Sequence, residues 1–315
     1  MENFESAENK KEREKYTSEI KLFFFRHGEK DKEKRALDSE IKISPDGKIK
    51  AIEKGKEINP EQSIATVAFG SSKKRTAETA SLVASGSNPE ITGEETLEEL
   101  TLKLDKELTG VGSKSGTDKR LDFSLDEESE FGKISQSHMK GIEKGGSRDY
   151  LKFLVEESDE LAEELGDKSG PTYLRMTSNI AGIVNKYLTI APRWDKIAKN
   201  NKDEYADALM KRFLSSHTGV LESFLAKIIE KTRGEEEVRK FIEAVNDQGF
   251  DKLEGFNVEI LSKDSGDADI CIYYKKEGEQ EETVFEFNEI VSPKIIRDLI
   301  IKAPPLQKHR HKVLK

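Results

Sequence analysis

The chain has 315 residues, of which 34% are hydrophobic and 37% are charged, and its formal net charge is −9. This acidic balance disfavours a broad surface for nucleic acid or anionic membrane, because both require clustered Lys and Arg. The single cysteine, Cys271, excludes an intramolecular disulfide, and no apolar run approaches the length of a membrane span. The first 16 residues also lack the apolar segment of a secretory signal. We therefore expect a cytoplasmic protein with neither nucleic-acid nor membrane partners.

The first third of the chain alternates between apolar runs and helix signals. Short apolar runs rich in aromatic residues predict buried strands, and Ser-Pro-Asp-Gly is a typical helix start. In chain order, we expect a disordered or frayed segment at 1–18, a strand at 20–25, a helix beginning at the turn 44–47 with Ile49, Ile52 and Ile58 on its packed face, a strand at 64–69, and a helix capped by Ser71 and Ser72 that ends near Ala84.

The periodic pattern fades after residue 100 and returns near residue 149. Gly, Ser, Lys and Asp dominate between these points, so we expect a charged insertion or cap at 101–171 that is partly flexible. The remaining elements expected are helices at 149–166, 172–190, 219–231 and 234–247, a strand that ends at His217, strands at 257–262, 268–275 and 283–290, the last two forming a hairpin, and a basic tail at 296–315.

Strands that alternate with helices predict an α/β sandwich of three layers, with a mostly parallel central sheet, over residues 19–295. Ligands of such sheets bind at the carboxyl ends of the strands. Arg26 and His27, the segment 71–75, and His217 each follow a predicted strand. The fold is therefore expected to bring three distant segments to one edge.

These residue types fit phosphate chemistry. A neutral imidazole nitrogen accepts a phosphoryl group, and a guanidinium matches phosphate oxygens with two parallel donors. Arg75 lies one turn into a helix whose free N-terminal N–H groups favour anions. Plain structural roles stay open for each: a surface or capping role for His27, a solvated basic face for residues 73–75, and a helix N-cap with an incidental histidine at 217.

Three motifs together carry a resemblance to a known family. They are Phe25-Arg26-His27-Gly28-Glu29, then Ser72-x-x-Arg75-x-x-x-Thr79-Ala80, then Ser216-His217-x-Gly219. In this order and spacing they resemble the histidine phosphatase superfamily, branch 1, the phosphoglycerate mutase-like proteins. The Ile43-Ser44-x-x-Gly47 turn and the helix after it resemble the same family. The likeness covers roughly 20–100 and 172–290.

The resemblance implies that His27 is phosphorylated and that Arg26, Arg75 and His217 bind the phosphoryl group, with no cofactor or metal. Leu97-Glu98-Glu99 resembles the Leu-x-Glu of the mutase-like branch, which implies Glu99 as the general acid, with Glu98 as a competitor. One departure is Lys30-Asp31-Lys32-Glu33, where many members have Thr and a later Asn. This departure weakens the case for phosphoglycerate mutase activity and favours a phosphatase.

Three hypotheses follow. The favoured one is a phosphomonoester hydrolase acting on a phosphorylated small molecule or a phosphoprotein. The alternatives are mutase-type phosphoryl transfer and a non-catalytic phosphate-binding or scaffold protein. A P-loop enzyme is disfavoured because the sequence lacks Gly-x-x-x-x-Gly-Lys-Ser/Thr, and a metallohydrolase is disfavoured because its five histidines lack ligand spacing.

Overall fold

The computed structural model of the chain describes residues 16–32, 37–59, 65–86, 88–105, 115–140, 149–278 and 282–300. Most of the N-terminal segment expected at 1–18 and most of the tail expected at 296–315 lie outside these residues. Within the described ranges, no helix combines the length and the apolar character needed to cross a membrane.

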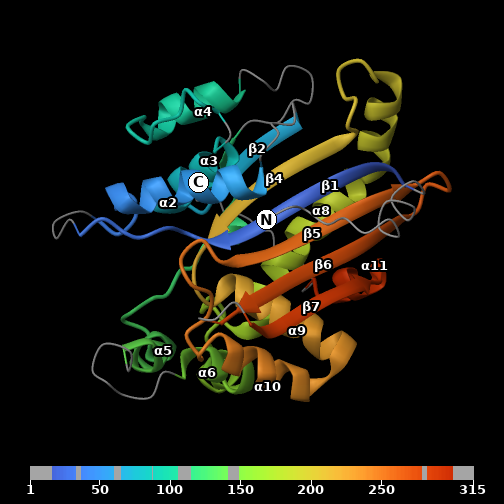
Figure 1. Cartoon of the computed structure of the whole chain (residues 1–315). Coiled ribbons are helices and arrows are strands. Elements are labelled where there is room, and N and C mark those ends of the chain that lie inside the picture. Colours follow the sequence, from blue (N-terminus) through green and yellow to red (C-terminus); the bar gives the residue numbers. More distant parts are fainter. Residues whose placement is uncertain are drawn as a thin grey trace, which may run out of the picture.

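The described strands form one mixed sheet of seven strands (Figure 1). The first four strands in sheet order run parallel, and the other three run antiparallel, which confirms both the α/β class and the predicted hairpin. In sheet order the strands are β3 (Gly116–Thr117), β2 (Ala65–Gly70), β4 (Leu209–Ser216), β1 (Tyr16–Arg26), β5 (Gly255–Lys263), β6 (Ala268–Glu277) and β7 (Thr283–Val291).

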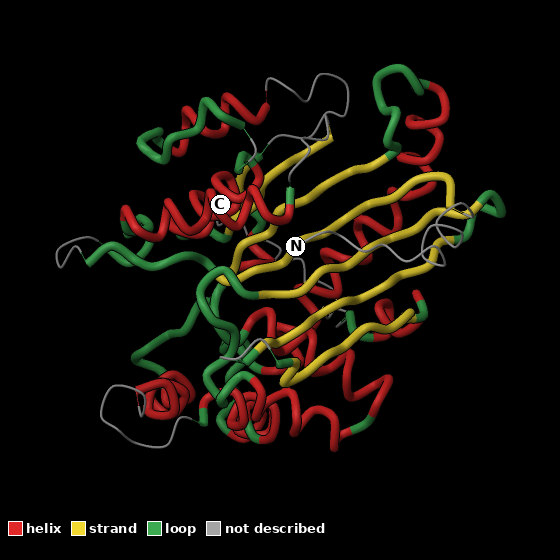
Figure 2. The backbone as a smooth tube through the Cα atoms, viewed as in Figure 1, coloured by secondary structure: helices red, strands yellow, loops and turns green. Residues whose placement is uncertain are grey.

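Helices cover the two faces of the sheet (Figures 1 and 2). The front face in these views carries α2 (Pro45–Ile58), α3 (Lys74–Ala84) and α4 (Leu97–Asp105). The back carries α8 (Tyr173–Asn200), α9 (Val220–Arg233), α10 (Glu235–Ala244) and α11 (Pro293–Asp298). Shorter elements lie between α4 and α8, namely η1 (Lys119–Leu121), α5 (Glu130–Lys140), α6 (Tyr150–Glu156) and α7 (Ser158–Glu164).

Strand β1 lies inside the sheet and is buried on both faces, which explains its run of aromatic residues. Phe23 faces α2 and α3 and stacks on Phe213, with ring centroids 4.8 Å apart. Phe24 points to the other face and stacks on Phe256 at 5.0 Å. Packing on both sides fixes the strand, and the strand fixes the position of the residues that follow it.

The structure differs from the sequence predictions in four places. The helix expected at 149–166 is two helices, α6 and α7, which are separated at Glu157. Ile49 is 54% exposed, because α2 buries the side containing Ala51 and Ile52 instead. Lys73, rather than Ser71 or Ser72, is the N-cap of α3, and the Ser71 hydroxyl bonds elsewhere. The helix expected at 172–190 continues through Pro192 to Asn200 as one long helix.

Candidate functional site

The two histidines predicted to act together lie side by side at the ends of neighbouring parallel strands. Arg26 of β1 pairs with Ser216 of β4, and the His27 amide donates to the Ser216 carbonyl over 3.0 Å. The imidazoles of His27 and His217 follow directly, with their ring centroids 5.4 Å apart. Both are buried, with 4% and 6% of their surface exposed. The arrowheads of β1 and β4 mark this place in Figure 1.

One hydrogen bond sets the tautomer of His27. Its Nδ1 lies 2.7 Å from the carbonyl oxygen of Gly28. Because a carbonyl only accepts, Nδ1 must carry the proton, and Nε2 keeps its lone pair. Burial, with the charge of Lys252 adding to it, moves the pKa of His27 far below its ordinary value. The ring is therefore neutral, and its unprotonated Nε2 has the lone pair that a nucleophile requires.

Helix α3 holds the turn after β1 and brings Arg75 to the nucleophile. The Gly28 amide donates to Thr79 Oγ1 over 3.1 Å, and that hydroxyl donates to the Arg75 carbonyl over 2.6 Å. Arg75 is 4% exposed, and its Nε points at His27 Nε2 over 3.4 Å. A fixed positive charge therefore lies beside the nitrogen that carries the lone pair.

His217 is held by the loop between β2 and α3. Its Nε2 lies 2.8 Å from the Ser71 hydroxyl, which lies 2.9 Å from the Thr76 hydroxyl. Burial, together with the charge of Arg75, lowers the pKa of His217 to about 3. Ser71 thus positions this imidazole, a role that the sequence prediction of a helix cap missed.

Arg26 completes the cluster from the other side of β1. Its Nη1 donates to the Phe250 carbonyl over 2.6 Å, while its Nε is buried with no hydrogen-bond partner among the described residues. A buried donor without an acceptor is costly, so it indicates a place where a ligand oxygen can bind. Of the four predicted phosphoryl-binding residues, His27, Arg75 and His217 thus lie side by side, and Arg26 precedes His27 at the end of β1.

Glu222 ties the loops around this cluster together and was not found from the sequence. It is fully buried on α9, and its carboxylate accepts from the amides of Gly219 (2.8 Å) and Phe250 (2.7 Å). Burial raises its pKa to about 7. Its position three residues after Gly219 at the start of a helix is the signal that could have found it, since this is a capping-box spacing.

Asp38, in the exposed turn before α2, covers the outer side of Arg75. Its carboxylate accepts from Arg75 Nη1 (3.0 Å) and Nη2 (3.3 Å), and it also pairs with Lys73 over 2.8 Å. Burial opposes ionisation here, but hydrogen bonds from Lys73 and Arg75 hold the pKa of Asp38 well below its usual range. A carboxylate therefore occupies the paired donors of the guanidinium.

Glu99 is not part of this arrangement. It is exposed on the first turn of α4, where its carboxylate accepts from the amide (2.7 Å) and hydroxyl (2.9 Å) of Thr96. These hydrogen bonds lower its pKa, whereas a general acid needs a raised one. Its role as a general acid stays a prediction. Glu98 beside it is also exposed.

Comparison with protein families gives a match over the first part of the chain. Residues 22–123 match the model described as the histidine phosphatase superfamily (branch 1). This segment is similar to that superfamily. The matched segment contains Arg26, His27 and Arg75, whereas His217 lies beyond it and joins the cluster through the pairing of β1 with β4.

The chain also matches solved structures, among them the following three. Phosphoglycerate mutase from Bacillus anthracis str. Sterne is 16% identical, with 91% of this chain and 99% of that chain covered, at a TM-score of 0.43. A mycobacterial glucosyl-3-phosphoglycerate phosphatase is 13% identical, with 86% and 98% covered, at 0.43. An Entamoeba histolytica phosphoserine phosphatase mutant in complex with phosphoserine is 15% identical, with 80% and 94% covered, at 0.38. No curated protein matches the chain significantly.

Proposed function

We propose that this protein hydrolyses phosphate monoesters by way of a phosphohistidine at His27. The observation that carries the proposal is the unprotonated Nε2 of a neutral, buried imidazole, which accepts a hydrogen bond from Arg75 Nε over 3.4 Å. Arg26 ends β1 beside the end of β4, and the His217 ring lies 5.4 Å from that of His27. This arrangement combines a nucleophile with fixed charge for the transferred group, which is what phosphoryl transfer requires.

The reaction has two steps. His27 Nε2 attacks phosphorus, the bond to the ester oxygen breaks with its electron pair, and that oxygen takes a proton from solvent and leaves as an alcohol. Water then attacks the phosphohistidine and releases a proton to solvent, the P–N bond breaks with its electron pair returning to Nε2, and phosphate leaves. Throughout, Arg26 and Arg75 stabilise charge on the phosphoryl oxygens, and the hydrogen bond to Gly28 holds the ring in its reactive tautomer.

The test is to trap the covalent intermediate. The purified protein is mixed with a ³²P-labelled phosphomonoester and quenched in base, which preserves phosphohistidine, and the labelled peptide is identified by mass spectrometry. We expect acid-labile label on His27 together with release of inorganic phosphate. Label that passes to a second phosphorylated metabolite instead of water would favour the mutase, whereas tight phosphate binding without any label would favour the non-catalytic protein.

The ion pair between Asp38 and Arg75 predicts that Asp38 competes with the substrate. Asp38→Asn is expected to tighten the binding of inorganic phosphate about fivefold, since an exposed ion pair is worth about 1 kcal/mol. Isothermal titration calorimetry measures this affinity. Glu40→Gln is the matched control, because Glu40 lies in the same turn but pairs with Lys74. Unchanged or weaker phosphate binding in Asp38→Asn would show that Asp38 orients Arg75 rather than competing.

A further inference from the structure

The loop Phe250–Glu254 is bound to the end of β1, directly beside His27. The Leu253 amide donates to the Arg26 carbonyl (3.1 Å), and the Arg26 amide donates to the Glu254 carbonyl (2.9 Å). Leu253 has a φ of +66°, a conformation that costs a leucine energy and persists only where its surroundings enforce it. The loop therefore has a fixed path, and Lys252 lies inside it.

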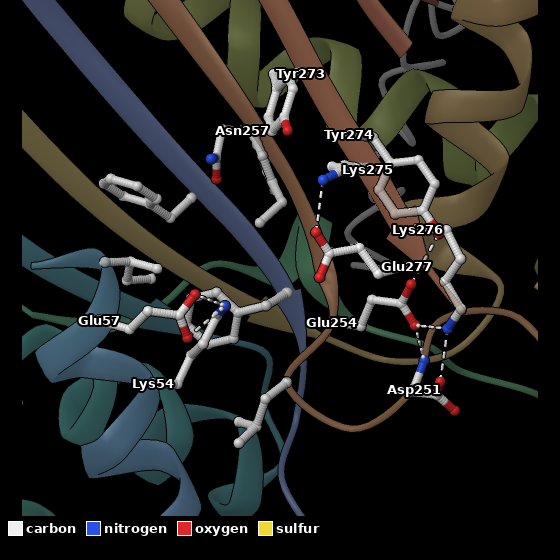
Figure 3. A pocket seen from close by; sticks show the side chains of 16 residues that line it. Lys54, Glu57, Asp251, Glu254, Asn257, Tyr273, Tyr274, Lys275, Lys276 and Glu277 are labelled. Carbon is white, nitrogen blue, oxygen red and sulfur yellow. Dashed lines mark hydrogen bonds and ion pairs between the residues drawn. The ribbon is translucent and has the colours of Figure 1, made fainter. Parts of the chain in front are cut away.

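The two acidic residues of this loop are engaged by side chains of β6. They bind Lys276 of β6, whose Nζ lies 2.7 Å from Asp251 and 2.9 Å from Glu254 (Figure 3). Tyr274 also donates to Glu254 over 2.8 Å. These contacts line a cavity of about 460 Å³ over β5 and β6. Asp251 and Glu254 are thereby unavailable as counter-ions for Lys252.

Lys252 is half-buried and has no ion pair or hydrogen bond with any described residue. The neighbouring charges that act most on Lys252 are those of Arg26 of β1, Arg75 of α3, and Lys30 and Glu29 of the turn after β1, so three of the four are cations. Its own charge acts on His27 more strongly than that of His217 or Arg75. Burial, followed by the charge of Arg26, lowers the pKa of Lys252 to about 7.

An ammonium group among like charges is unfavourable until an anion joins it. In the same way, the Nε of Arg26 on the adjoining strand has no acceptor among the residues that the structure describes. We infer that Lys252 is an anion-binding residue of this site, which binds a negatively charged oxygen of the substrate beside His27. The inference rests on the proposed function and adds a residue outside the three sequence motifs. The oxygen belongs either to the phosphoryl group or to a second acidic group of the substrate.

The test compares Lys252→Met, Lys252→Arg and the control Lys276→Met in the full chain. Sulfate and O-phosphoserine are the probes, and calorimetry gives their affinities. We expect Lys252→Met to weaken binding about 10- to 100-fold, the value of a hydrogen bond between charged groups. If the variant binds both probes more weakly, the oxygen belongs to the phosphoryl group. If it binds only O-phosphoserine more weakly, the oxygen belongs to a second acidic group of the substrate. Lys276→Met should leave both affinities unchanged.

A pH series adds a readout that a structural lysine would not change. Sulfate keeps its charge between pH 6 and 9, so its binding to the unmodified protein should weaken above pH 7 as the Lys252 amine loses its proton, by up to about tenfold per pH unit. Glu222, which faces Arg26 from α9, ionises in the same range. Arginine stays charged, so Lys252→Arg should bind sulfate at pH 7 and keep only the smaller dependence due to Glu222.

The inference is overturned if Lys252→Met binds both probes as tightly as the unmodified protein, or if Lys276→Met weakens them equally. The inference and the proposed function can fail separately. Sulfate binding that depends on Lys252, without any phosphohistidine, would reject the proposed hydrolysis and support the anion site. Labelling of His27, together with anion binding that does not depend on Lys252, would support the hydrolysis and reject the anion site. Thermal unfolding of each variant shows whether it is folded.

Discussion

Replacement of His27 by asparagine is expected to lower kcat for an aryl phosphate by about 10⁴-fold or more, as removal of a catalytic nucleophile does. The asparagine amide can still donate to the Gly28 carbonyl, the bond now made by Nδ1. It has no lone pair to replace that of Nε2, because its nitrogen is part of an amide. The loss should therefore appear in turnover, while the fold is kept.

Steady-state release of inorganic phosphate measures this effect, and thermal unfolding checks the fold. His138→Asn is the matched control. That histidine stacks on Phe153 at 4.3 Å and bonds Asp149 over 3.1 Å, so it belongs to the packing around α5 and α6. The His138→Asn variant should turn over substrate at the same rate as the unmodified protein. If His27→Asn kept turnover within about tenfold, the covalent mechanism would be wrong.

Gly255→Ala is expected to destabilise the protein by about 3 kcal/mol, the upper range for an overpacked position. Gly255 pairs with Phe25 on β1, and a Cβ at this glycine would lie 1.8 Å from the Phe24 carbonyl oxygen. A backbone atom cannot move aside as the end of a flexible side chain can, so the added methyl group must push β5 away from β1. That movement would disturb Arg26, which receives its backbone contacts from the loop just before β5.

Urea unfolding, followed by circular dichroism, gives the change in free energy of unfolding. The control is Gly116→Ala on β3, where an added Cβ would have no atom of the described residues within 4 Å. This variant should lie within about 0.5 kcal/mol of the unmodified protein. Equal stabilities for the two variants would show that β1 and β5 have room to separate.

Sequence patterns predicted the parts of the fold that depend on local hydrophobic runs. The strand at 20–25, the strand ending at His217 and the hairpin of β6 and β7 all follow from apolar residues that need burial. The meeting of His27 with His217 also follows, since parallel strands end at one edge. Arg75 was predictable for the same reason, because it follows β2 at the start of α3.

The remaining site residues lie where no periodic pattern constrains the chain. Asp38 and Lys252 come from irregular segments, and the sequence offers 62 acidic and 53 basic residues that look alike before folding. What distinguishes these two is the charge that tertiary structure places around them. The role of Glu99, which its motif spacing suggested, stays a prediction, and its carboxylate accepts from the Thr96 that precedes its own helix.

The carboxylate that bridges Arg75 and Lys73 has a consequence for selectivity. To displace Asp38, a ligand must bind the Arg75 guanidinium more favourably than the Asp38 carboxylate does. Chloride, acetate and the free carboxyl groups of metabolites bring one negative charge at most and gain nothing by the exchange. A dianion with three tetrahedrally arranged oxygens gains from the arginine and lysine together. The Asp38 carboxylate should therefore prevent abundant monovalent anions from binding to Arg75.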